Sequence, residues 1–192
     1  MRKPRTIAPC LVLLLFLFTL TASSAAGEET SKEKSQTAEE LYNTGYMMIL
    51  LGRPEEAIQL FKKSLEIEVT AEAYTYMGWA FSHMGEYKKA VGEAERAIRI
   101  DPDFGNPYND IGVYLIEQGR EDEAIPYLEK AMRAKRYCCY QFPHFNMGKI
   151  YLKKKMFEKA REEFQKSLAI DPSYAPAREA LELLKESGVK ET

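Results

Sequence analysis

Apolar and polar positions alternate with helical spacing along most of the chain. Large apolar residues recur at i, i+3, i+4 and i+7 within segments of about 14 residues, with charged residues between them. Two of these segments end at the pairs Asp101–Pro102 and Asp171–Pro172, where proline prevents a helix from continuing. The pattern therefore predicts paired amphipathic helices, such as 71–84 and 87–100, with Gly85 in the turn between them.

The same pattern repeats four times. Glycines at intervals of 33, 34 and 36 residues have a similar neighbourhood, and they are Gly45, Gly78, Gly112 and Gly148. An alanine follows each glycine twelve residues later, and these are Ala57, Ala90, Ala124 and Ala160. A period near 34 with small residues at fixed offsets is typical of helical-hairpin repeats. We expect each glycine in a first helix to let the second helix of its unit approach closely.

Four registered copies of the glycine, of the apolar residue three positions after it and of the alanine, together with Asp–Pro stops in two units, make the chain resemble the tetratricopeptide repeat family. The resemblance implies an all-α, right-handed α-solenoid in which the first helices line the concave face. The four units are expected at 38–70, 71–104, 105–140 and 141–174. Residues 174–187 carry a further apolar stripe and should form a capping helix, followed by a tail at 188–192.

Unit three is longer than the others and carries an aromatic insertion over 134–143. The insertion either lengthens the second helix of this unit or forms a bulged loop. It is faintly similar to the pilotin-like repeat proteins of type IV pilus assembly. Those proteins are lipoproteins, and this chain has no cysteine after its apolar N-terminal run that could carry a lipid.

Residues 1–26 have the order of a secretory signal. Three basic residues precede an apolar run over 11–20, and small residues at 22–26 follow it. This order predicts a signal peptide that is cleaved near Ala26. The alternative is an uncleaved anchor formed by 6–26. This segment is about long enough to span a bilayer, which takes a helix of roughly 20 residues. Either form predicts an exported protein, periplasmic or secreted, with membrane contact only through this segment.

The rest of the chain begins with a polar segment, 27–37, which lacks an apolar face and is expected to be a disordered linker. Removing 1–26, which hold three basic and no acidic residues, changes the formal net charge from −2 to −5. A mildly acidic chain with interspersed charges lacks the basic stripe of a nucleic-acid-binding protein. We therefore expect no nucleic-acid partner.

The residues that could carry chemistry are few. Two histidines, His83 and His144, lie in different units without neighbours at metal-ligand spacing, so we expect no metal, no cofactor and no catalysis. The adjacent pair Cys138–Cys139 lacks the CxxC spacing of redox sites. A redox role of this pair stays open as the weaker alternative, in a helper of cytochrome maturation.

The resemblance places one set of side chains on the inner wall, and this set is rich in aromatic residues. An apolar cleft of this length suggests a groove for a peptide or a partner protein. The chain is accordingly expected to be a non-catalytic scaffold or adaptor; the alternative is an envelope assembly factor for a pilus, a secretin or a cytochrome. The inner-wall residues are Tyr42, Tyr46, Ile49, Thr75, Trp79, His83, Asn109, Val113, Ile116, Phe145, Lys149 and Leu152.

Overall fold

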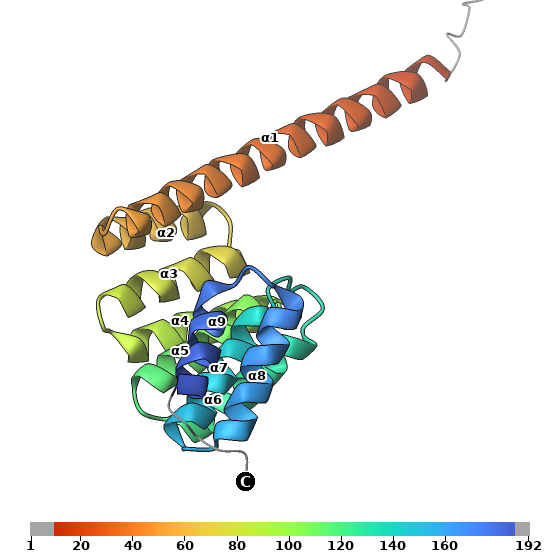
Figure 1. Ribbon diagram of the computed structural model, residues 1–192. Coiled ribbons are helices and arrows are strands. Elements are labelled where there is room, and N and C mark those ends of the chain that lie inside the picture. The colour runs from red at the N-terminus through yellow and green to blue at the C-terminus, as the bar shows by residue number, and fades with distance from the viewer. Residues whose placement is uncertain (1–9, 187–192) are drawn as a thin grey trace, which may run out of the picture.

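A computed structural model describes residues 10–186, with side chains from residue 30 onward. Within this part of the chain every regular element is a helix. The helices pack in chain order as antiparallel neighbours, and the N-terminal half of α1 projects away from the stack (Figure 1). Their bounds are α1 Cys10–Leu50, α2 Pro54–Ile67, α3 Ala71–His83, α4 Tyr87–Ile100, α5 Asn106–Glu117, α6 Glu121–Arg133, α7 Gln141–Lys153, α8 Phe157–Ile170 and α9 Ala175–Glu186.

Consecutive helices form the four expected hairpins, and the fold is an all-α solenoid closed by α9. The turn inside each hairpin contains one residue in the left-handed region. Glycine provides it in three units, with φ of 71° at Gly52, 73° at Gly85 and 72° at Gly119. Lys155 takes the same position in unit four with φ 58°, a conformation that costs a residue with a Cβ more than it costs glycine.

The repeating glycines bring the two helices of a hairpin together, as the spacing predicts. A Cβ on Gly112 would lie 2.5 Å from Leu128 Cδ2, and a Cβ on Gly148 would lie 2.4 Å from Phe164 Cε1. The matching alanines of the second helices, Ala124 and Ala160 among them, are fully buried. The contact is thus close enough to exclude any larger side chain at the glycine.

Units one and four share a further bond between their two helices. Ser64 Oγ donates to the carbonyl of Ala38 at 2.7 Å, and Ser167 Oγ donates to the carbonyl of Gln141 at 2.9 Å. Both serines are fully buried, so the bonds satisfy hydroxyls that water cannot reach. Ala38 is also buried, which agrees with a packed unit that begins at this residue.

The segment 27–37 differs from the sequence expectation. It belongs to α1 and is helical, where the sequence predicts a disordered linker. Thr37 Oγ1 donates to the Glu33 carbonyl at 2.9 Å within this helix. The segment contains no proline, and its Glu, Lys and Gln residues are good helix formers, so the helix of unit one can continue outward without an apolar face.

Several expectations about the ends fall on parts that are not described. Residues 1–9 and the tail 188–192 lie outside the described residues, as do the side chains of 10–29. The signal or anchor segment therefore stays a prediction. Within the described residues, no helix combines the length and the apolar character needed to cross a bilayer.

Candidate binding groove

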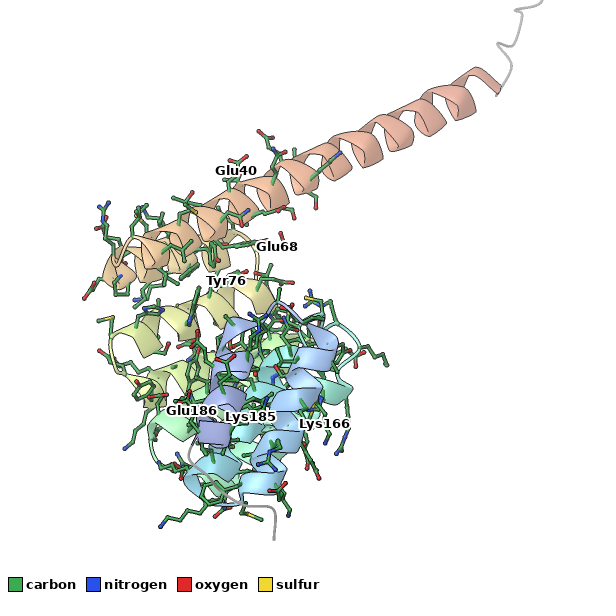
Figure 2. All side chains as sticks on the ribbon, in the orientation of Figure 1. Glu40, Glu68, Tyr76, Lys166, Lys185 and Glu186 are labelled. Carbon is green, nitrogen blue, oxygen red and sulfur yellow. The ribbon has the colours of Figure 1, made fainter. Side chains whose placement is uncertain are left out.

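A cavity of about 390 Å³ lies where α1, α3 and α5 meet the loop that follows α6. Its walls are aromatic and polar, with a single acidic side chain. Tyr76, labelled in Figure 2, belongs to α3 and contacts two tyrosines of α1. The lining residues are Tyr46, Thr75, Tyr76, Trp79, Asn106, Asn109, Asp110, Tyr137, Cys139 and Phe142.

Stacked rings form the wall between α1 and α3. The rings of Tyr46 and Trp79 are stacked with centroids 5.7 Å apart, and Tyr76 is tilted against Tyr46 at 5.1 Å. Tyr42 stacks on Tyr76 from the other side at 6.0 Å. Such contacts stabilise ring pairs beyond the area they bury. The wall therefore presents ring faces whose positions are fixed before any partner arrives.

The insertion of unit three forms the opposite wall. Helix α6 ends at Arg133, so the extra residues are a loop and not a longer helix. The loop is bonded to the preceding turn: Arg136 N donates to the Asp103 carbonyl at 2.9 Å, and Gly105 N donates to the Arg136 carbonyl at 3.1 Å. The Arg136 guanidinium lies 4.1 Å from the centroid of the Phe104 ring and pairs with Asp101 Oδ2 at 2.6 Å. A second ion pair joins Arg136 to Glu72 of α3.

These contacts hold Tyr137 against the backbone of the turn. A Cβ on Gly105 would lie 2.4 Å from Tyr137 Cβ, so glycine is needed here to admit the tyrosine. Tyr137 is buried, and its hydroxyl has no hydrogen-bond partner. Burial, followed by the charge of Asp110, raises the pKa of this hydroxyl well above its usual value. Tyr137 thus remains a neutral hydroxyl at the edge of the cavity.

A second cavity of about 310 Å³ adjoins the first and shares Trp79 and Asp110 with it. His83 meets the Trp79 ring edge-on, with centroids 5.3 Å apart. The two cavities together form one groove along α3 and α5, and we use "the groove" for both. The second cavity is lined by Trp79, Ser82, His83, Tyr87, Asp110, Val113, Tyr114 and Glu117.

Asp110 lies at the junction of the two cavities. Asn109 Nδ2 donates to Asp110 Oδ1 at 3.5 Å, and Asn146 Nδ2 donates to Asn109 Oδ1 at 3.1 Å. Among the described residues, no lysine or arginine forms an ion pair with Asp110. Burial raises the pKa of Asp110 to about 7, and the bond from Asn109 only partly opposes this. The groove thus contains a carboxyl group whose charge no cation compensates.

The structure distributes the twelve predicted inner-wall residues unevenly. Tyr46, Thr75, Trp79 and Asn109 line the first cavity, and Trp79, His83 and Val113 line the second. Tyr42 supports the aromatic wall through Tyr76. Their role in binding stays a prediction. The other predicted residues lie outside the two cavities, and they are Ile49, Ile116, Phe145, Lys149 and Leu152.

For two of these residues the predicted position is wrong. Ile49 is 2% exposed and packs in the core with Phe61 and Met77, because the last turn of α1 lies on α2 and α3. Phe145 packs against Phe164 and Tyr174, so it belongs to the contact between α7, α8 and α9. Ile116 packs on the central core, while Leu152 is exposed.

His144 and the cysteine pair, the remaining residues that could carry chemistry, have local contacts. His144 Nδ1 lies 2.7 Å from Glu163 Oε2, so His144 takes part in a polar pair. Cys138 and Cys139 are free thiols with sulfurs 2.8 Å apart. Burial, together with the neighbouring Cys138, raises the pKa of Cys139 to about 11. The described residues contain no cluster of three or more acidic, histidine or cysteine side chains that could hold a metal.

Ten residues of the groove are not among the predicted inner-wall residues. Six of them line the first cavity, and they are Tyr76, Asn106, Asp110, Tyr137, Cys139 and Phe142. Four line only the second cavity, and they are Ser82, Tyr87, Tyr114 and Glu117. Asp110 and Tyr76 occupy the same position of their units, directly after a predicted inner residue. That shared offset is a signal in the sequence. Tyr137 and Cys139 come from the insertion, whose position has no equivalent in the other units.

Family models of the tetratricopeptide repeat match most of the chain. One model matches residues 71–104 and 142–174, and a second matches 38–68 and 106–138. The four matches fall on the four helical hairpins. The chain is also 31% identical over 103 residues to small glutamine-rich tetratricopeptide repeat-containing protein 2 of Mycosarcoma maydis. That alignment covers 53% of this chain and 29% of the fungal protein, so the chain spans less than a third of that relative's length.

Two further similarities extend over nearly the whole chain. The type IV pilus assembly protein PilF of Pseudomonas aeruginosa is 27% identical over 205 residues, covering 95% of this chain and 81% of PilF. A solved structure of Pseudomonas aeruginosa PilF has a TM-score of 0.69 at 25% identity and covers 83% of this chain and 80% of its own. A structure of MamA reaches 0.61 at 26% identity, covering 77% and 86%. From the repeat matches and the solenoid they fall on, the chain belongs to the tetratricopeptide repeat family.

Proposed function

We propose that this protein is a non-catalytic scaffold of the cell envelope that binds a segment of a partner protein in the groove. The observation that carries the proposal is the first cavity, about 390 Å³ in volume and lined by rings from α1 and α3 and by Tyr137. Aromatic side chains in a concave, partly desolvated site are the usual anchors of protein interfaces. Members of this repeat family bind protein partners through their concave face, which supports the same role here.

The envelope context rests on two observations of different kinds. Residues 1–26 have the order of a signal peptide or anchor. The similarity to the type IV pilus assembly protein PilF extends over 95% of the chain, including this N-terminal part. We therefore propose assembly of an envelope structure, such as a pilus, as the process that this scaffold serves. N-terminal sequencing of the exported protein distinguishes cleavage near Ala26 from an intact anchor.

The redox alternative receives less support from the cysteine pair. Reactive cysteines have a lowered pKa because a thiolate is the nucleophile. The pKa of Cys139 is instead raised, to about 11, by burial and by Cys138. Cys139 also lines the first cavity, where an inert thiol contributes apolar surface to the wall. A scaffold role uses this arrangement without any change in oxidation state.

Site-specific photocrosslinking tests the proposed function in living cells of the source organism. A photoreactive phenylalanine analogue replaces Tyr46, which lines the cavity, and in a matched strain it replaces Gln165, which is exposed on α8. We expect defined protein adducts from position 46 and none of the same size from position 165. Adducts that form from position 165 alone would place partner binding on another face and contradict the proposal.

A second measurement uses the partner once it is identified. Trp79 is the single tryptophan of the chain and stacks on Tyr46 in the groove. Its fluorescence should shift to the blue on binding because the partner displaces water from the ring. Trp79→Ala should weaken binding by about 2 kcal/mol, as expected for a central aromatic anchor. Lys166→Ala on α8 is the control and should leave the affinity unchanged.

A further inference from the structure

The groove combines a carboxyl group without a counterion and a fixed set of aromatic faces. Asp110 and Trp79 are the two residues that border both cavities, so a ligand at the junction can meet the carboxyl and the indole together. Tyr46 and Tyr76 extend the ring wall from this point toward α1. A carboxylate beside ring faces is the arrangement that attracts a cation, by charge and by cation–π contact.

The charges of the groove are unbalanced in one direction. Asp110 and Glu117 line the two cavities, and neither cavity is lined by a lysine or an arginine. The nearby Arg136 is already engaged with Glu72 and Asp101 and stacks on Phe104. Lys149, which the sequence predicts on the inner wall, lines neither cavity. The protein itself therefore supplies no fixed cation to this carboxyl group.

The raised pKa of Asp110 also favours a cationic ligand. Burial raises the pKa of its carboxyl group to about 7, which measures how unfavourable the unpaired charge is at this position. The attraction of an incoming cation would offset part of that cost. Asn109 donates a hydrogen bond to the carboxyl group of Asp110 at 3.5 Å, and Asn146 in turn donates to the amide oxygen of Asn109 at 3.1 Å, so the one partner of the carboxyl is itself held in place.

From this arrangement we infer that the groove recognises a basic side chain of the partner segment, arginine in preference to lysine, at the junction formed by Asp110 and Trp79. This inference rests on the proposed function and specifies its ligand. Arginine fits because its planar guanidinium can contact an aromatic ring of the groove while its N–H groups donate to the carboxylate. A lysine ammonium is more strongly hydrated and cannot stack in this way.

The test uses small probes and does not require the natural partner. The probes are N-acetyl-arginine methylamide, the lysine counterpart, and the citrulline counterpart, which has nearly the same shape and no charge. The readout is the indole N–H resonance of Trp79, which is unique because the chain has one tryptophan. The protein is the chain from residue 27 to 192, compared with Asp110→Asn and with Glu95→Gln, an exposed acid on α4.

The arginine probe should shift the Trp79 resonance in a saturable manner, and citrulline should bind at least about tenfold more weakly. Lysine should fall between them. Asp110→Asn should reduce arginine affinity by at least about tenfold, and Glu95→Gln should not change it. Equal binding of arginine and citrulline to the wild-type chain, or no saturable shift, would overturn the inference whatever the fold of the variants.

The outcome is separable from that of the proposed function. If position 46 still crosslinks to its partner in an Asp110→Asn background with unchanged yield, the groove binds a protein but not through a basic side chain. If the arginine probe binds as expected while position 46 gives no adduct in cells, the cation site exists and the proposed partner binding in the groove is wrong. Loss of the adduct in Asp110→Asn, with retention in Glu95→Gln, supports both.

Discussion

Two carboxylates lie inside this solenoid, Asp110 on α5 and Glu163 on α8, and their surroundings differ. Glu163 is 7% exposed, and it has two partners at 2.7 Å, His144 Nδ1 and Lys166 Nζ. Burial alone would raise the pKa of Glu163, but the bonds from His144 and Lys166 outweigh it and lower the pKa below its usual value. Asp110 has only an amide partner, and burial raises its pKa to about 7.

The difference separates a structural charge from one that is available to a ligand. Removing a charge from water is costly, and a protein normally compensates the cost with partners of its own. Unit four does this for Glu163 through His144 and Lys166. Units two and three leave Asp110 uncompensated beside a cavity. Similar hairpins thus produce a closed end and an open groove, and the missing partner of Asp110 lies where we propose that binding takes place.

The largest effect on the comparison between the two ends is expected from removing the helix that covers α8. Deleting residues 175–192 removes α9, whose Ala177 and Leu184 are buried against Ala160 and Phe164. The uncovered face of α8 is apolar, so we expect a loss of about 3 kcal/mol or more in the free energy of unfolding, with a tendency to aggregate. Urea unfolding and light scattering measure this. A soluble truncated chain of unchanged stability would show that α9 does not close the solenoid.

The next largest effect on stability is expected from removing a partner of Glu163. His144→Ala should leave Glu163 buried with a single remaining partner, and we expect a loss of about 2 kcal/mol in unfolding free energy at pH 7. Lys166→Ala is the matched control, because Lys166 is largely exposed and its removal should cost less than about 1 kcal/mol. Urea unfolding of both variants decides the matter. A neutral His144→Ala would mean that Glu163 does not depend on its partner.

The contribution of the unit-three loop to the groove can be tested by a substitution in the turn that it packs against. Gly105→Ala would place a Cβ 2.4 Å from Tyr137 Cβ, an overlap that only a shift of the loop can relieve. We expect a loss of about 1–2 kcal/mol in stability, as for other overpacked contacts. The arginine probe should also bind more weakly, because Tyr137 is part of the cavity wall. The control is Gly92→Ala on α4, where a Cβ meets no neighbour. Unchanged probe binding in Gly105→Ala would remove the loop from the groove.

The parts of the fold that are predictable from the sequence are those that depend on backbone contact. Gly112 and Ala124 mark a helix pair because nothing larger fits, and that constraint repeats in every unit. The groove is less predictable. Their positions in the repeat place Ile49 and Phe145 on the inner wall. In the structure Ile49 packs in the core, and Phe145 packs against α8 and α9. The position of a residue in a repeat does not specify which neighbour covers it.

The missed residues show the other limit. Tyr137 belongs to an insertion without a repeat register, so its contact with Gly105 is visible only in three dimensions. Asp110 is distinguished by the lack of a counterion, and a one-dimensional pattern of charges does not reveal which of them remain unpaired. The helical continuation of α1 through 27–37 was likewise hidden, because that segment has no apolar face to signal a helix.

The smallest expected effect is also the most specific, since it concerns the sign of a pH dependence. The pKa of Asp110 is about 7 in the folded chain, against a usual value of 3.8, so the folded state retains a proton that the unfolded state has lost between these values. The contribution of Asp110 to stability is therefore full below pH 3.8 and is lost as the pH rises to about 7. Asp110→Asn removes this dependence, so its stability should equal that of wild type near pH 4 and should increasingly exceed it as the pH rises to 8.

The charge of Asp110 acts on Tyr76, Tyr114 and Tyr137, but the pKa values of these hydroxyls are raised above their usual value of 10, so they stay protonated across pH 4 to 8. The other titratable side chains of the two cavities are present in both variants, and they are Tyr46, His83, Tyr87, Glu117 and Cys139. Glu163→Gln provides the opposite sign, because a lowered pKa contributes stability that is present at neutral pH and lost on acidification. Thermal unfolding of the three chains across pH 4 to 8 measures both curves. If the two difference curves have the same sign, the contrast between a partnered and an unpartnered carboxylate is wrong, and the argument for a basic ligand at Asp110 loses its electrostatic basis.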